Sequence, residues 1–269
     1  MRRSQYAALA LLLCICSPSA GAATPVKKAW LKIKNANQGD LPRESMTRYP
    51  SLRSAGGLLR SLDYLGTVAF ATGGAICAGR AGMDLLGCIE IGVITAMGGG
   101  TTRDLLLGQT PVFWLQEVEY LAMCIVTSIA TFYAWPHLRH MPILSASGSS
   151  DDGALPRWLD TIGLGAFAVV GTQHGIRRRL HPLATVVIAT ITCSFGGVTR
   201  DVMTKAPIRV MHSHAELYAT TAAAGSCAYL IARAAVADPL LRMAAGFGVT
   251  VAARFAAWTL DLRLPTLKA

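Results

Sequence analysis

Two short segments of this sequence place an arginine and an aspartate just behind glycines, at the end of a long apolar run. The first, GGGTTRD, contains Gly98, Gly99, Gly100, Arg103 and Asp104, and the second, FGGVTRD, contains Gly196, Gly197, Arg200 and Asp201. Glycine is unfavourable in the interior of a helix, and a charge in apolar surroundings needs a partner or water. Charged residues inside an apolar run are typical of a path for ions or small polar solutes.

The residues around these segments have the composition of a membrane protein. The chain has 269 residues, of which 52% are hydrophobic and 15% charged, and its mean hydropathy is +0.42. Apolar stretches of about 20 residues, the length that crosses the hydrocarbon of a bilayer, fill the chain from residue 58 to residue 260. We predict seven spans, at 58–79, 85–102, 111–135, 158–174, 183–199, 215–231 and 240–260. Backbone groups in lipid must be satisfied within each span, which predicts an all-α integral membrane fold.

The N-terminal part of the chain differs from the apolar part. Residues 1–23 have a basic start, an apolar core and small residues, as in a secretory signal peptide or the first part of a targeting leader. Residues 24–57 are polar and basic, and we interpret them as a linker or transit segment. This leader predicts a plasma membrane or an organelle membrane as the location. The net charge of +10 lies largely here and in short basic loops, so it indicates anionic lipids as neighbours and not nucleic acid.

The apolar part of the chain contains an internal repeat. Asp63 aligns with Asp160, Phe70 with Phe167, and the two Arg-Asp pairs align in the same register. Residues 58–135 and 158–232 therefore form two three-helix repeats, joined by a connector at 136–157 and followed by a seventh helix and tail at 233–269. Because three spans are an odd number, the second repeat must enter the membrane from the opposite side. Inverted repeats of this kind are common in transport proteins.

The repeated glycines and charges lead to two structural expectations. The glycines should break the second and fifth helices and expose backbone groups to a pore. Neighbouring residues on a helix do not face each other, so we expect Arg103 to pair with Asp201, and Arg200 with Asp104, across the repeats. The two segments would then form the halves of one gate. The alternative is that each charge reaches separately to water at the membrane surface.

A few other polar residues in the spans carry weaker expectations. Glu90 in the second span either attracts cations into the pore or is protonated and hydrogen-bonds another helix. Gln173 and His174 in the fourth span favour interhelical hydrogen bonds over solute binding. Asp63 and Asp160 are expected to cap or anchor span starts.

These stretches, together with LDYLGTVAFATGGAICAGR and LDTIGLGAFAVVGTQHGI, resemble bacterial membrane proteins with a paired glycine-transporter domain, a family related to the trimeric intracellular cation (TRIC) channels. The resemblance covers about residues 58–264. It implies a seven-helix protomer, a homotrimer, and a pore in each protomer lined by the kinked second and fifth helices. It implies that the glycines and Arg-Asp pairs named above are pore or gate residues. Phe195 departs from the pattern, because it stands where the first repeat has Gly98.

Three functions stay open at the level of the sequence. The first is a channel that passes a small solute or a potassium-like monovalent cation. The second is a secondary carrier of glycine or a similar small zwitterion, and the third is a structural or lipid-binding membrane protein. The expected partners are further copies of the chain, membrane lipids and the small solute, and small residues in the sixth and seventh spans favour close helix contacts in a trimer. We expect no enzymatic activity, no cofactor, no metal site and no nucleic-acid binding.

Overall fold

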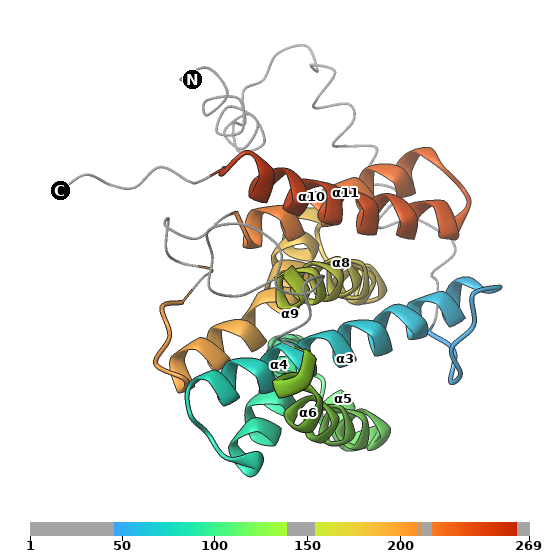
Figure 1. Cartoon of the computed structure of the whole chain (residues 1–269). Coiled ribbons are helices and arrows are strands. Elements are labelled where there is room, and N and C mark those ends of the chain that lie inside the picture. The colour runs from blue at the N-terminus through green and yellow to red at the C-terminus, as the bar shows by residue number, and fades with distance from the viewer. Residues whose placement is uncertain (1–45, 139–153, 209, 211–216, 263–269) are drawn as a thin grey trace.

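The computed structural model describes residues 46–138, 154–208, 210 and 217–262, and this part of the chain is helical without strands. It contains eight helices (Figure 1): α3 (Ala55–Arg80), α4 (Leu85–Leu106), α5 (Phe113–Gln116), α6 (Glu119–Leu138), α8 (Ala154–Arg177), α9 (Pro182–Met203), α10 (Ala219–Ala235) and α11 (Pro239–Thr259). The predicted signal peptide, most of the basic linker and most of the connector lie outside the described residues.

Local sequence signals determine where several helices begin. Ser54 accepts a hydrogen bond from the backbone N–H of Gly57 at the start of α3, and Asp84 accepts one from Gly87 at the start of α4. Asp238 does the same for Leu240 in α11, whose first residue is a proline. Side-chain caps satisfy N–H groups that the first helical turn leaves without a partner. The predicted span at 111–135 is wrong at its start, because a separate short helix, α5, precedes α6.

Helices α4 and α9 run unbroken through their glycines, so the expected helix breaks are wrong. The glycines instead allow these two helices to cross at backbone contact. A Cβ atom added at Gly99 would lie 2.1 Å from the carbonyl oxygen of Thr192, and one added at Gly196 would lie 2.0 Å from that of Thr95. The helix propensity lost at glycine is therefore offset by a close approach that no other residue permits.

The two repeats contact each other reciprocally. The rings of Phe70 in α3 and Phe167 in α8 have centroids 5.2 Å apart, and these phenylalanines are equivalent in the repeat. A Cβ atom added at Gly66 would touch Phe167, and one added at Gly163 would touch Phe70. When two repeats contact each other through equivalent residues, they are related by a local two-fold axis. Helix α11 lies outside this pair of repeats and packs on α10 and α8.

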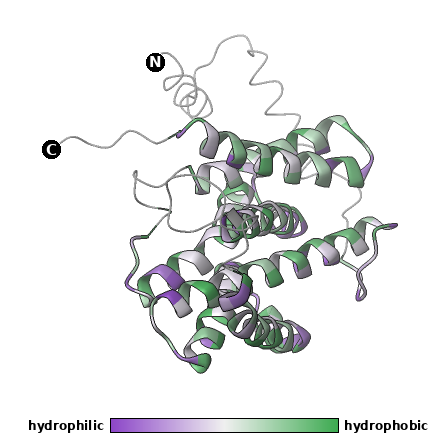
Figure 2. Cartoon of the chain, viewed as in Figure 1, coloured by the Kyte–Doolittle hydropathy of each residue, from purple (hydrophilic) through white to green (hydrophobic). Residues whose placement is uncertain are grey.

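The outer surface of the helices suits a membrane. Four helices, α4, α6, α9 and α11, are long and apolar enough to cross a bilayer by length and composition. Large apolar side chains such as Val126, Tyr133 and Leu105 are more than half exposed. Figure 2 shows hydrophobic residues along the helices and hydrophilic residues gathered mostly at helix ends and in loops. Exposed apolar surface of this extent is expected where lipid replaces water.

Candidate functional site

Each predicted Arg-Asp pair lies at the C-terminal end of its helix and is closed within itself. Arg103 donates to Asp104 from Nε at 2.9 Å and from Nη2 at 2.8 Å. Arg200 donates to Asp201 in the same way, at 2.8 Å and 2.7 Å. The expected pairing across the repeats is therefore wrong. The rule that sequence neighbours do not face each other holds for short side chains, whereas the long arginine stem bends back and brings its donor fork to the adjacent carboxylate.

The pair in the first repeat also holds the chain that follows α4. Asp104 is fully buried and accepts a further hydrogen bond from the backbone N–H of Phe113 at 2.9 Å. The guanidinium of Arg103 lies 5.6 Å from the centroid of the Phe113 ring. In addition, Trp114 Nε1 donates to Thr101 Oγ1 at 3.0 Å. The pair therefore orders the turn from α4 into α5, which is a structural role that the sequence did not indicate.

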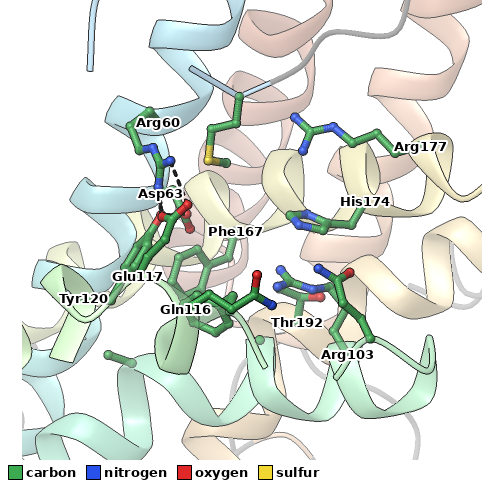
Figure 3. A pocket seen from close by; sticks show the side chains of 15 residues that line it. Arg60, Asp63, Arg103, Gln116, Glu117, Tyr120, Phe167, His174, Arg177 and Thr192 are labelled. Atoms are coloured by element: carbon green, nitrogen blue, oxygen red, sulfur yellow. Dashed lines mark hydrogen bonds and ion pairs between the residues drawn. The ribbon is translucent and has the colours of Figure 1, made fainter. Parts of the chain in front are cut away.

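A cavity of about 240 Å³ opens beside this turn (Figure 3). Its lining comes from α3 and the chain before it, from α4, α6, α8 and α9, and from the segment around α5. It consists of Met46, Arg60, Asp63, Ala96, Gly100, Arg103, Gln109, Phe113, Gln116, Glu117, Tyr120, Phe167, His174, Arg177 and Thr192. Among the residues predicted from the sequence as pore or gate, only Gly100 and Arg103 line it. Gly98, Gly99 and Gly196 instead lie at the crossing of α4 and α9.

One wall of the cavity is a hydrogen-bonded network of two carboxylates, an arginine and a tyrosine. Arg60 donates to Tyr120 Oη at 2.7 Å and forms an ion pair with Glu117 through both terminal nitrogens. Tyr120 in turn donates to Asp63. Asp63 does not cap a helix, because it lies within α3, but it anchors this part of α3 to α6 through the tyrosine, which is the other role expected for it. Figure 3 shows these four side chains together on one side of the cavity.

The opposite wall is basic. Arg103, His174 and Arg177 lie on this side in Figure 3, facing the wall that carries Asp63 and Glu117. His174 Nδ1 is 2.9 Å from the backbone oxygen of Val170. A carbonyl oxygen only accepts, so Nδ1 carries a hydrogen and donates to it. The cavity therefore has carboxylates on one wall and cationic or hydrogen-bonding side chains on the other, an arrangement suited to a small charged or zwitterionic solute.

The other polar residues singled out in the spans, Gln173, His174 and Glu90, have different environments. Gln173 donates from Nε2 to Tyr229 Oη and so joins α8 to α10, which confirms the interhelical role expected for it. The hydrogen bond of His174 goes instead to Val170 within α8, and the side chain lines the cavity, so the choice between an interhelical role and solute binding stays a prediction for this residue. Glu90 lies on an exposed face of α4 and is not part of the cavity lining, and its place in a pore stays a prediction. Within the described ranges, no group of three or more histidine, cysteine, aspartate or glutamate side chains is arranged to hold a metal ion.

Sequence reasoning missed most of the cavity because its residues come from distant segments. Arg60, Glu117 and His174 carry no motif of their own. The repeat register held one usable signal, because it pairs Asp63 with Asp160 and brings Tyr120 close to alignment with Tyr218. An acid and a tyrosine that recur together in both repeats indicate a shared interaction, and the structure has that interaction in both.

Comparison with known proteins places the chain among membrane channels and related proteins. The model of the family described as glycine transporter matches residues 60–136 and 157–234. The UPF0126 inner membrane protein YadS of Escherichia coli K12 is 33% identical over 210 residues, which cover 76% of this chain and 94% of YadS. A UPF0126 membrane protein of Vibrio cholerae is 31% identical over 213 residues, which cover 78% of this chain and 82% of that protein.

Two solved structures share the fold. The orthologue of the TRIC trimeric intracellular cation channel from Rhodobacter sphaeroides has 31% sequence identity and a TM-score of 0.67, over 76% of this chain and 99% of that one. A second TRIC cation channel has 34% identity and a TM-score of 0.68, over 78% and 97% of the two chains. These relatives are membrane channel or UPF0126 proteins, and none of the four is an enzyme.

Proposed function

The chain belongs to the glycine transporter family of multi-pass membrane proteins, and we propose that it is a channel that passes a small monovalent cation through a pore in each protomer. It is a membrane channel or transporter, as its sequence predicted. The observation that supports the proposed pore is the charged cavity within the helix bundle, lined by Ala96 and Gly100 of α4 and by Thr192 of α9. The names of the solved relatives support a cation as the solute.

The proposed pore runs between two inverted repeats. Seven spans, α3, α4, α6, α8, α9, α10 and α11, would place three in each repeat and leave α11 as an addition. The reciprocal contacts between α3 and α8 and between α4 and α9 support a two-fold relation between the repeats. The crossing of α4 and α9 at Gly99 and Gly196 leaves no room for a solute. We therefore infer that this crossing is the closed point of the path, in place of the glycine-broken pore expected from the sequence.

A second candidate function is carriage of a small zwitterion such as glycine. It is favoured by the two walls of the cavity, because an ammonium group suits Asp63 and Glu117 whereas a carboxylate suits Arg103, His174 and Arg177. A carrier needs such a site to be reached from each side of the membrane in turn. Purified protein in potassium-loaded liposomes separates the two functions. Discrete steps of potassium current support a channel, and saturable glycine uptake without current supports a carrier. If the protein shows neither current nor uptake, a structural role is supported.

The Asp63 carboxylate should matter most to the passage of a cation. Asp63→Asn keeps an acceptor for Tyr120 but removes a negative charge from the cavity wall. We expect potassium current in liposomes to fall about tenfold, which corresponds to about 1.4 kcal/mol of lost attraction. Asp238→Asn is the matched control, since asparagine also caps a helix and this residue lies at the start of α11, outside the cavity. A current that falls with Glu90→Gln but not with Asp63→Asn would contradict this prediction and would indicate that the pore passes Glu90 and not the cavity lined by Asp63.

We propose a homotrimer, on the strength of the trimeric relative. The small residues of α10 and α11, which favoured a trimer at the level of the sequence, do not all support it. Gly225 and Gly246 allow contact between these helices inside one protomer, since a Cβ atom added at Gly225 would lie 1.8 Å from Thr250 Oγ1. Mass measurement in mild detergent and in nanodiscs should give three copies of the chain. A single copy under both conditions would contradict the trimer.

A further inference from the structure

The second repeat holds an acid and a tyrosine that match the pair in the cavity wall. Tyr218 donates to Asp160 at 3.1 Å, as Tyr120 donates to Asp63 in the first repeat. Arg200 occupies the position of Arg103 in the repeat register. Cys77 occupies the position of His174 in the repeat register. The two repeats therefore contain equivalent acid–tyrosine pairs, of which the first lines the cavity described above.

The two pairs differ in the source of the arginine beside the tyrosine. In the first repeat, Arg60 of α3 lies 5.8 Å from the centroid of the Tyr120 ring. The repeat register places Arg157 at the equivalent position, but the guanidinium of Arg157 lies over the ring of Trp258 in α11, at 5.5 Å. Arg254, also from α11, lies against the second tyrosine as Arg60 does against the first, 4.9 Å from the centroid of the Tyr218 ring. Helix α11 therefore contacts Arg157 through Trp258, and it supplies Arg254 to the ring of Tyr218.

Arg254 forms an ion pair with the carboxylate of Asp160 but does not donate a hydrogen bond to Asp160 Oδ2. Its Nη2 lies 3.7 Å from Asp160 Oδ2, which is an ion-pair distance but too long for a hydrogen bond. Asp160 Oδ2 is buried and accepts no hydrogen bond within the part of the chain that the structure describes. The side chains of Arg254 and Asp160 are 6% and 11% exposed, and Arg254 Nη1 donates to the backbone oxygen of Leu217 at 2.9 Å. A buried carboxylate oxygen without a donor is a position that a small cation would fill.

We propose that Asp160 and Tyr218 form a second cation site on the path, and that Arg254 is a tethered cation which occupies this site while the path is closed. The inference rests on the proposed function, because it assumes that the path carries a small monovalent cation. When the path opens, Arg254 withdraws with α11 and the permeating cation takes its place beside Asp160. The additional seventh helix thus supplies the arginine at the second pair, whereas Arg60 at the first pair belongs to α3 of the repeat itself.

Modification of Cys77 tests Arg254 as a lock on the path without relying on transport. Cys77 is partly exposed and its Sγ lies 3.9 Å from Thr204 Oγ1. The starting protein carries Cys14→Ser, Cys16→Ser and Cys227→Ser, while Cys88, Cys124 and Cys193 are buried. With a small cationic thiol reagent, we expect slow modification of this protein and about a tenfold faster rate in Arg254→Gln, because the open state becomes more populated. A further Cys77→Ser change should abolish the reaction.

Two matched variants separate a lock from a simple packing role. Arg254→Lys keeps the charge and should keep modification slow, whereas a role of the guanidinium in packing alone would make lysine behave like glutamine. Arg157→Gln also removes a cation from Trp258 but not from Asp160, so it should leave the rate unchanged. The proposal is overturned if Arg254→Gln reacts at the starting rate, if Arg157→Gln is accelerated equally, or if Arg254→Lys matches Arg254→Gln.

Potassium current in liposomes distinguishes failure of the lock from failure of the proposed function. Arg254→Gln should raise the current about tenfold, and adding Asp160→Asn should remove this gain, because the second cation site is then lost. Faster modification of Cys77 without any current would support the lock and contradict the cation channel. Unchanged modification in a protein that conducts would support the channel and overturn the lock.

Discussion

Gly196→Ala should lower the free energy of unfolding by about 1–3 kcal/mol or more, because the added methyl group overpacks the crossing of α4 and α9. The new Cβ atom would lie 2.0 Å from the carbonyl oxygen of Thr95 and 3.0 Å from its carbonyl carbon. Both are backbone atoms of a helix, so they can move away only if the two helices separate. Thermal unfolding of the purified protein in mild detergent, together with the yield of monodisperse protein, measures the effect.

The next residue along the chain provides a control. A Cβ atom added at Gly197 would have only Arg200 Nη2 nearby, at 3.7 Å, which is an ordinary contact. Gly197→Ala should therefore be neutral or stabilising, since alanine favours a helix interior over glycine by about 1 kcal/mol. Gly99→Ala should repeat the loss seen for Gly196→Ala, because its Cβ atom would lie 2.1 Å from the carbonyl oxygen of Thr192. Equal stability of Gly196→Ala and Gly197→Ala would show that the helices do not cross at this point.

The crossing of α4 and α9 stabilises the fold and also bounds the cavity. The contacts of Gly99 with Thr192 and of Gly196 with Thr95 are equivalent under the repeat, so α4 and α9 meet as a symmetric pair. The cavity reaches this pair, since Ala96 and Thr192 belong to its lining. On the proposed function, a solute that enters the cavity would therefore be stopped where the two helices touch. An open state would require a change in how α4 and α9 cross, and not the bending of one broken helix.

The sequence predicted the helices well because membrane physics leaves few alternatives. An apolar stretch of about 20 residues in lipid must satisfy its own backbone, and the helix is the structure that does so for a single segment. The repeat was equally accessible, because Asp63, Phe70 and Arg103 each recur at one fixed spacing. These signals are local or periodic, so they can be read without knowledge of which helices touch.

The glycines and charges were misinterpreted because their roles depend on partners that are distant in the sequence. The low helix propensity of Gly98, Gly99 and Gly100 predicted a break, but a close helix contact offsets that propensity. The start of α6 was missed for a similar reason, since Glu117 ends the segment after α5 where it pairs with Arg60 of α3. Both outcomes are decided by tertiary contacts, and a single sequence does not contain the distances that set them.

Arg103→Met should lower the free energy of unfolding by about 3–5 kcal/mol, because it leaves the carboxylate of Asp104 buried and without its cation. Asp104 has no exposed surface, and both of its bonds to Arg103 are lost at once. Only the bond from the backbone N–H of Phe113 would remain. The turn between α4 and α5 should loosen as well, which would enlarge the cavity that Phe113 lines. Unfolding in mild detergent and the yield of folded protein report the loss.

Two double variants decide which carboxylate depends on this arginine. Arg103→Met with Asp104→Asn should regain most of the stability, because no charge is left buried alone and the asparagine oxygen still accepts from Phe113. Arg103→Met with Asp201→Asn should be less stable than the single variant, because it leaves Asp104 unpaired and also deprives Arg200 of its partner. The two changes in the first variant should be strongly coupled, and those in the second nearly additive. The opposite ranking would show that the charges pair across the repeats, in which case the two Arg-Asp segments would act together as one gate.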